Sequence, residues 1–247
     1  MIAQAIVRAK SFIGRQKRNY RVGMARASAN SFLTGLTSQY SAIYTVGLGA
    51  DSVQLGSISS VGSAISALIS TPVGWMVDRY GIKQFYLLAI ALMAGGSLFR
   101  AMAHDWRFLV VATVLASIAT RLSGTGCRVI SADSVQNRDR VTAQNVCGAL
   151  AAIAGMISPL LAAYLVTYFG GMTVDGIRPL YSIQVAGYVL VLLGVAFQLR
   201  EPQRKRIASP KAKVNFIADF RFLFAHRHGL GRWIAISALT SLPLAMY

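Results

Sequence analysis

Long apolar stretches, separated by short polar segments, run through most of the chain. Six of them are long enough to cross a membrane as helices, at residues 27–50, 53–77, 84–103, 108–130, 141–169 and 180–199. A transmembrane helix needs about 20 residues to cross a hydrocarbon layer of about 30 Å. The stretches are too long and too continuous for the strands of a membrane barrel. The pattern therefore predicts an all-α fold, a polytopic membrane helix bundle with six transmembrane helices.

A seventh apolar stretch starts near Trp233 and is still running where the sequence ends at Tyr247. The segment before it is basic and is interrupted by Pro202 and Pro210, so we expect a linker there. The expected organisation is a basic segment at 1–26, the six-span bundle at 27–199, the linker at 200–229 and a truncated seventh span at 230–247.

The composition and the placement of charge agree with a membrane protein. Hydrophobic residues make up 55% of the chain and charged residues 13%, whereas about 25% of the residues in soluble domains are charged. The net charge of +17 comes mainly from basic residues before the first span and after the second, fourth and sixth spans. By the positive-inside rule, the N-terminus and the linker are cytoplasmic. We therefore expect a multi-pass protein of the cell (inner) membrane.

The basic charge has other interpretations. A nucleic-acid-binding face would interleave basic residues with exposed aromatic residues, and none of the basic runs does so, so no nucleic-acid partner is expected. The N-terminal segment places Ile2, Ile6 and Phe12 on one helical face, which favours an interfacial helix on an anionic inner leaflet of the bilayer. Its Arg-rich start without acidic residues is also typical of an organelle transit peptide.

The polar junction between the second and third spans carries a specific motif. It reads G-x-x-x-D-R-x-G-x-K and consists of Gly74, Asp78, Arg79, Gly81 and Lys83. An acidic residue at a membrane boundary is costly unless it is paired, so Asp78 beside Arg79 is a functional candidate. The motif resembles the signature of the loop between spans two and three in the major facilitator superfamily of transporters. Ile82 stands where that family usually has a further basic residue.

The resemblance implies a secondary transporter of a small solute that works by alternating access around a site at the membrane midplane. Members of the family have two six-span halves, so the chain is expected to be the N-terminal half and the start of the C-terminal half. The implied partners are a small-molecule substrate, a coupling proton as a further candidate, and a second six-span half, with no cofactor and no enzyme activity. The alternative is a non-transporting six-span protein, either the membrane domain of an ATPase-driven complex or an assembly scaffold.

Polar residues recur along the first span. They are Asn30, Thr34, Thr37, Ser41 and Tyr44. Their spacing places them in one stripe along a helix. A polar stripe that faces lipid would be costly, so the stripe is predicted to line an aqueous cavity and bind substrate, as the resemblance also implies for the first span. The alternative is helix packing, with the hydroxyl groups bonded back to the backbone.

The fourth span contains two arginines. Arg121 is 15 residues from Trp106, which places it about 22 Å into a layer of about 30 Å. The glycines that follow Arg121 are similar to the fourth span of the superfamily. Arg121 is therefore a candidate for binding an anionic substrate group or for tuning a proton-coupling carboxylate, and the alternative is a structural ion pair. Arg128 lies two turns further on and is expected to pair with Asp78 at the inner boundary.

Small residues recur in the fifth span, at Gly148, Gly155 and Ser158. They resemble the antiporter variant of the family's fifth-span motif, and the same spacing is typical of a helix-packing face. The sequence contains no H-E-x-x-H motif, zinc-spaced cysteine pair, phosphate-binding loop or nucleophilic serine elbow. No metal site is expected.

Overall fold

The computed structural model describes residues 18–80, 82–135 and 139–199, and these ranges contain helices and no strands. The helices are α2 (Arg18–Ser38), α3 (Ser41–Gly47), α4 (Ser52–Tyr80), α5 (Ile82–Ala101), α6 (Trp106–Ser134), α7 (Arg140–Tyr168) and α8 (Val174–Gln198). The all-α prediction is confirmed. The expected interfacial helix, linker and seventh span fall largely or wholly outside the described residues.

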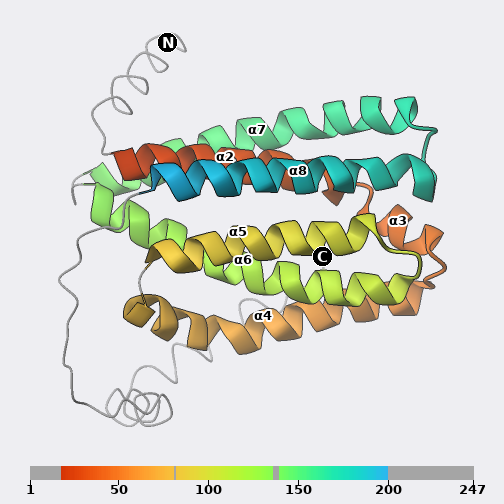
Figure 1. Ribbon diagram of the computed structural model, residues 1–247, viewed down its shortest axis with the longest axis horizontal. Coiled ribbons are helices and arrows are strands. Elements are labelled where there is room, and N and C mark those ends of the chain that lie inside the picture. The colour runs from red at the N-terminus through yellow and green to blue at the C-terminus, as the bar shows by residue number, and fades with distance from the viewer. Residues whose placement is uncertain (1–17, 81, 136–138, 200–247) are drawn as a thin grey trace. The chain divides into compact units, whose positions relative to one another are not determined.

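The long helices lie side by side, and each runs antiparallel to the one before it (Figure 1). The N-terminal end of the bundle is the end where α2 begins, and it also holds the α4–α5 and α6–α7 connections. The α3 end holds α3 and the α5–α6 and α7–α8 connections. Five helices, α4 to α8, contain stretches that are long and apolar enough to cross a membrane. Helix α2 is more polar because it carries Arg21, Arg26 and the polar stripe.

The first span is divided where one continuous helix was expected over residues 27–50. Helix α2 ends at Ser38, a turn follows at Gln39 and Tyr40, and α3 begins at Ser41. The hydroxyl groups of Ser38 and Ser41 donate to the carbonyls of Gly35 and Ser38, at 3.4 and 2.9 Å. Such local bonds compete with the helical ladder and bend helices. The break changes the direction of the chain before Tyr44.

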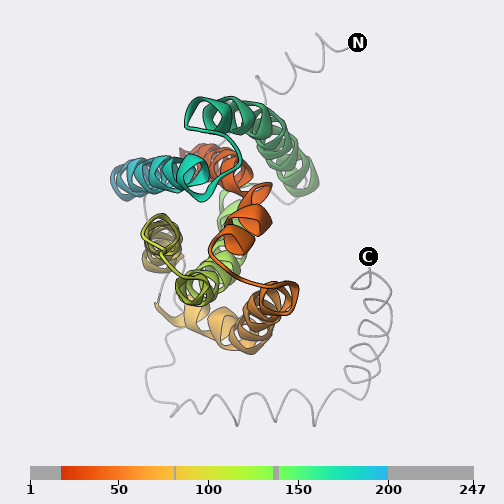
Figure 2. The same cartoon turned by 90° about the vertical axis from the view of Figure 1, so that its right-hand side faces the viewer.

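The two halves of the bundle repeat one pattern of packing. Helix α4 packs on α6 as α7 packs on α2, and α5 packs on α6 as α8 packs on α2. Helices α5 and α8 also pack on each other. Figure 2 shows the same helices viewed end-on. Exchanging the first three spans with the last three preserves the pattern, which is the relationship that internal repeats of transporters produce.

A buried glutamine joins three helices in the middle of the bundle. The side-chain nitrogen of Gln184 on α8 donates to the carbonyl of Leu33 on α2 at 2.9 Å. The hydroxyl of Ser97 on α5 donates to the side-chain oxygen of Gln184 at 3.0 Å. Buried polar groups cost free energy unless they are hydrogen-bonded, and both ends of this amide are. The network fixes α2, α5 and α8 relative to one another.

Small residues allow α2 and α7 to approach closely. A Cβ atom on Gly35 would clash with the hydroxyl of Ser158, which is completely buried. A Cβ atom on Gly155 would lie 2.9 Å from the hydroxyl of Ser31. These contacts match the packing interpretation of the small residues in the fifth span.

Candidate functional site

The polar stripe of the first span meets a tyrosine from the sixth. The hydroxyl of Tyr188 on α8 lies 3.1 Å from Oγ1 of Thr34 and donates to Oδ1 of Asn30 at 3.5 Å. The tyrosine is only 2% exposed, whereas Thr34 is exposed and Asn30 is partly exposed. Asn30 and Thr34 therefore form, with Tyr188, a polar patch that reaches the surface of the bundle.

The next two residues of the predicted stripe do not join this patch. The hydroxyl of Thr37 donates to the carbonyl of Thr34 at 3.4 Å, and the hydroxyl of Ser41 donates to the carbonyl of Ser38 at 2.9 Å. Thr37 is buried and Ser41 is exposed beyond the helix break. Their hydrogen bonds correspond to the packing alternative, in which hydroxyl groups bond back to the backbone.

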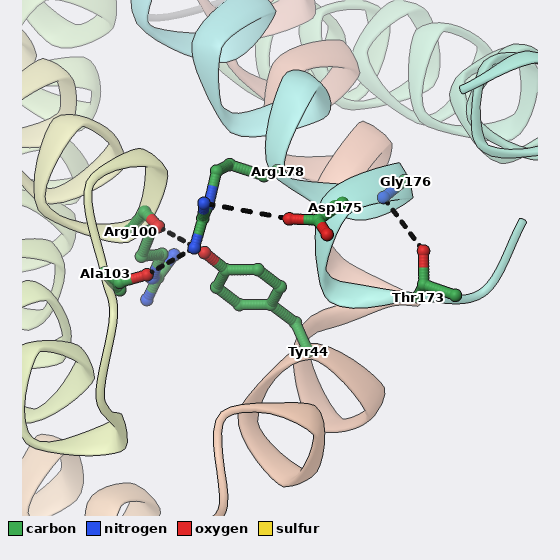
Figure 3. A network of polar contacts seen from close by, with 7 residues as sticks. All are labelled: Tyr44, Arg100, Ala103, Thr173, Asp175, Gly176 and Arg178. Carbon is green, nitrogen blue, oxygen red and sulfur yellow. Dashed lines mark hydrogen bonds and ion pairs between the residues drawn. The ribbon is translucent and has the colours of Figure 1, made fainter. Parts of the chain in front are cut away.

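Tyr44 lies at the α3 end of the bundle, beside Arg100, Ala103 and Arg178 (Figure 3). It is 1% exposed, and its hydroxyl donates to the carbonyl of Arg100 at 2.7 Å. Its ring packs against Tyr181, with the ring centroids 5.0 Å apart. Beside it, Nη2 of Arg178 donates to the carbonyl of Ala103 at 2.8 Å. Tyr44 and Arg178 thus satisfy backbone carbonyls at the C-terminal end of α5, where the helix itself offers fewer donors.

The start of α8 is held in the same cluster. Oγ1 of Thr173 accepts a hydrogen bond from the backbone nitrogen of Gly176 at 3.1 Å, an N-cap arrangement. Nη1 of Arg178 lies 3.8 Å from a carboxylate oxygen of Asp175, whose side chain is 91% exposed. The contacts around Tyr44 therefore connect α3, α5 and α8, and their role is structural.

Arg26 is buried inside the bundle, although its sequence position predicted that it belongs to the basic N-terminal segment. It is 4% exposed. Its Nη2 donates to Oγ of Ser123 on α6 at 2.6 Å, and its guanidinium carbon lies 4.1 Å from the ring centroid of Tyr86 on α5. Arg26 precedes Asn30 by one helical turn, so the stripe continues to it. The four-residue spacing from Asn30 is the sequence feature from which Arg26 could have been predicted as a member of the stripe.

Arg121 lies on the exposed surface of α6, within the stretch that can span a membrane. It is not one of the residues in the hydrogen bonds that join Asn30, Thr34 and Tyr188. A role for Arg121 in binding an anionic group stays a prediction.

The loop motif lies at the N-terminal end of the bundle. Gly74, Asp78 and Arg79 belong to the last turns of α4, and Lys83 lies in the first turn of α5, where it is partly exposed. Gly81 falls outside the described residues, as do the side chains of Asp78, Arg79 and Arg128. The pairing of Asp78 with Arg128 therefore stays a prediction. Among the described residues, no group of three or more His, Cys, Asp or Glu side chains could hold a metal ion.

Solved transporter structures resemble this arrangement. A POT family transporter in complex with a thioalcohol-conjugated peptide matches with a TM-score of 0.61 and 17% identity, over 96% of this chain and 47% of that one. A bacterial homolog of the human lysosomal transporter Spinster, inward-facing and unoccupied, matches with a TM-score of 0.60 and 17% identity, over 88% of this chain and 49% of that one. The chain thus spans about half the length of these proteins. At this identity the likeness concerns the fold.

Sequence comparison identifies the family. No curated protein sequence matches the chain. The sequence model of the Major Facilitator Superfamily, however, matches residues 22–247, which is most of the chain. The five apolar helices and the transporter-like fold agree with that match. The chain therefore belongs to the Major Facilitator Superfamily of multi-pass membrane proteins.

Proposed function

We propose that this chain forms the N-terminal six-span half, and the start of the second half, of a secondary transporter that moves a small solute by alternating access. The observation that carries the proposal is the polar patch of Asn30, Thr34 and Tyr188. It combines polar side chains of α2 and α8 and reaches the surface of the bundle at Thr34. Such a patch would be costly against lipid and is useful against a hydrated cavity.

In the proposed mechanism, this half supplies one wall of the solute site and a second six-span half supplies the other. Asn30 and Thr34 contact the solute, and Tyr188 holds their side chains in place. Arg121 is proposed as a second contact, either for an anionic group of the solute or for a proton-coupling carboxylate on the other half. Thr37, Ser41 and Tyr44 support the shape of the first span, because their hydroxyl groups are engaged with backbone carbonyls.

The loop motif is proposed to act as the gate on the cytoplasmic side of the cell (inner) membrane. The excess of basic residues at the N-terminal end of the bundle supports a cytoplasmic location for that end. Asp78 paired with Arg128 would close the gate, while Arg79 and Lys83 meet lipid phosphates. The Asp78→Asn variant should then lose most transport and still insert into the membrane.

Solute uptake into liposomes tests the proposal on the chain joined to its second six-span half. A panel of radiolabelled amino acids, dipeptides, sugars and organic acids is screened for saturable uptake. Thr34→Val, which removes one hydroxyl, should raise the KM for a transported solute by up to about tenfold, the value of one hydrogen bond. Thr167→Val is the matched control, because that exposed hydroxyl on α7 donates to its own helix at the carbonyl of Ala163.

Two results would contradict the proposal. If Thr34→Val and Thr167→Val have the same KM, the polar patch is not part of the solute site. No saturable uptake of any solute, together with copurification of an ATPase subunit, would favour the membrane domain of an ATPase-driven complex instead.

A further inference from the structure

Arg26 is a cation buried in the bundle, and no carboxylate among the described side chains pairs with it. Its Nε atom is buried and has no hydrogen-bond partner. Its other contacts are with neutral groups, the hydroxyl of Ser123 and the ring of Tyr86. The ion pairs among the described side chains, Arg107 with Asp105 and Arg178 with Asp175, involve residues at the α3 end of the bundle. No described carboxylate therefore neutralises Arg26.

An arrangement of this kind is expensive for a purely structural residue. Removing a charge from water costs several kcal/mol, and a partner of opposite charge normally offsets that cost. A hydroxyl and the face of one tyrosine ring offset only part of it. An apolar side chain in this place would leave the bundle at least as stable. A bound anion would supply the missing compensation for this charge.

The chemistry of the side chain restricts the anion. A guanidinium group presents its donors in a planar fork that matches the paired oxygens of carboxylate, phosphate and sulfonate groups. Tyr86 covers one face of the guanidinium, so the edge of the plane, which carries the donors, is the part left for a ligand. A halide or another spherical anion would not use this geometry.

The position of Arg26 connects it with the proposed solute site. Arg26, Asn30 and Thr34 follow one another at intervals of four residues on α2, about 6 Å per interval along the helix. Arg26 is buried, Asn30 is partly exposed and Thr34 is exposed. A small solute whose polar body lies against Asn30 and Thr34 would therefore have its far end next to Arg26.

Resting on the function proposed above, we infer that Arg26 is an oxyanion subsite. The transported solute carries a carboxylate, phosphate or sulfonate group about 6–12 Å from its neutral polar groups. Arg26 holds the oxyanion, Ser123 and Tyr86 hold the guanidinium, and Asn30 and Thr34 contact the remainder of the solute. The same chemistry occurs in a lipid headgroup, so the test must separate the two sources.

Thermal unfolding of the full chain in a phosphate-free detergent tests the subsite, with inorganic phosphate as the probe. Phosphate should raise the Tm saturably, by about 5–10 °C at 100 times its Kd. Sodium chloride at equal ionic strength should not. In Arg26→Met the rise should disappear, while the Tm without phosphate stays equal or increases, because an apolar side chain replaces an uncompensated charge. Arg21→Met is the matched control, since Arg21 is an exposed arginine on the same helix.

Each outcome decides the inference. An equal phosphate response in Arg26→Met, or its loss in Arg21→Met as well, would overturn it. If Arg26→Met fails to fold, Arg26→Lys decides instead, because it keeps the charge and loses the fork: at least tenfold weaker phosphate binding supports the subsite, and unchanged binding overturns it. Stabilisation by dihexanoyl phosphatidic acid but not by inorganic phosphate would assign the site to a lipid headgroup and overturn the solute inference.

Transport measurements separate this inference from the function on which it rests. Saturable uptake of a neutral solute that Arg26→Met leaves unchanged would overturn the oxyanion subsite and leave the transporter intact. If the protein binds phosphate through Arg26 but transports no solute, the oxyanion site is supported and the transporter proposal is contradicted.

Discussion

The hydroxyl of Tyr44 on α3 donates to the backbone carbonyl of Arg100 on α5 at 2.7 Å. The two residues are 56 positions apart in the sequence. The same carbonyl also accepts a longer hydrogen bond, from the backbone nitrogen of Ala103 at 3.3 Å. The short helix α3 is thus fastened to the end of α5 by a side chain, although a break separates it from α2.

Replacing Tyr44 with phenylalanine should destabilise the bundle by about 1 kcal/mol, because the ring contact with Tyr181 remains and one hydrogen bond is lost. Thermal unfolding in detergent measures the change. Tyr40→Phe serves as the control, since the hydroxyl of Tyr40 forms no hydrogen bond with a described residue. Equal destabilisation by both variants would contradict a specific role for the bond to Arg100.

Arg178 should stabilise the bundle through its hydrogen bond to the carbonyl of Ala103 and not through its ion pair with Asp175. Arg178→Ala removes the bond to the carbonyl of Ala103, which lies in a fully buried residue, and should cost about 1.5–3 kcal/mol. Asp175→Asn removes only the charge of a highly exposed partner at 3.8 Å and should cost less than about 0.5 kcal/mol. Comparing the two unfolding curves checks the order, and a larger effect of Asp175→Asn would reverse the assignment.

Close packing of α2 on α7 gives a prediction for Gly35. Gly35→Ala places a Cβ atom against the hydroxyl of Ser158 and should destabilise the bundle by about 1–3 kcal/mol. Gly148→Ala on α7 is the control, because a Cβ atom there meets nothing within 4 Å. That variant should be neutral or gain up to about 1 kcal/mol from helix propensity. Thermal unfolding measures both.

A double variant identifies the cause of the Gly35 effect. Ser158→Gly removes the group that the new Cβ atom meets. The double variant Gly35→Ala with Ser158→Gly should therefore lose less unfolding free energy than the two single variants lose together. Simple additivity would show that the strain at Gly35 arises elsewhere.

Much of the fold is predictable from the sequence because hydropathy dominates it. Runs of apolar residues at least as long as a bilayer is thick can only form spanning helices, and each predicted stretch overlaps a helix or helices of the bundle. The break after Ser38 was not predictable from hydropathy, since it arises from hydroxyl groups that bond to nearby carbonyls. Hydropathy averaged over the length of a span does not register such local hydrogen bonds.

The candidate site was predictable only in part. Asn30 and Thr34 stand out as polar residues in the first span. Gln184 and Tyr188 share one face of α8 with Tyr181 at spacings of three and four residues, but this pattern was not used to predict a site. Tyrosine is frequent in spanning helices for other reasons. Arg26 was grouped with the basic residues that flank the first span, because charge counting cannot tell a flanking arginine from one that points into the bundle.

The direction of the bundle in the membrane gives the last prediction. Asp51 and Asp175 are exposed residues at the α3 end, and Arg140 is an exposed residue at the N-terminal end. The excess of basic residues at the N-terminal end predicts that the α3 end faces outward. In a variant without Cys127 and Cys147, single cysteines at 51 and 175 should react with an impermeant thiol reagent added to intact cells. A cysteine at 140 should react only after the cells are opened, since a charged reagent cannot cross the bilayer. Outside labelling at 140, with protection at 51 and 175, would reverse the orientation and place the loop motif of Asp78 and Arg79 on the outer side, where the positive-inside rule would no longer account for its basic residues.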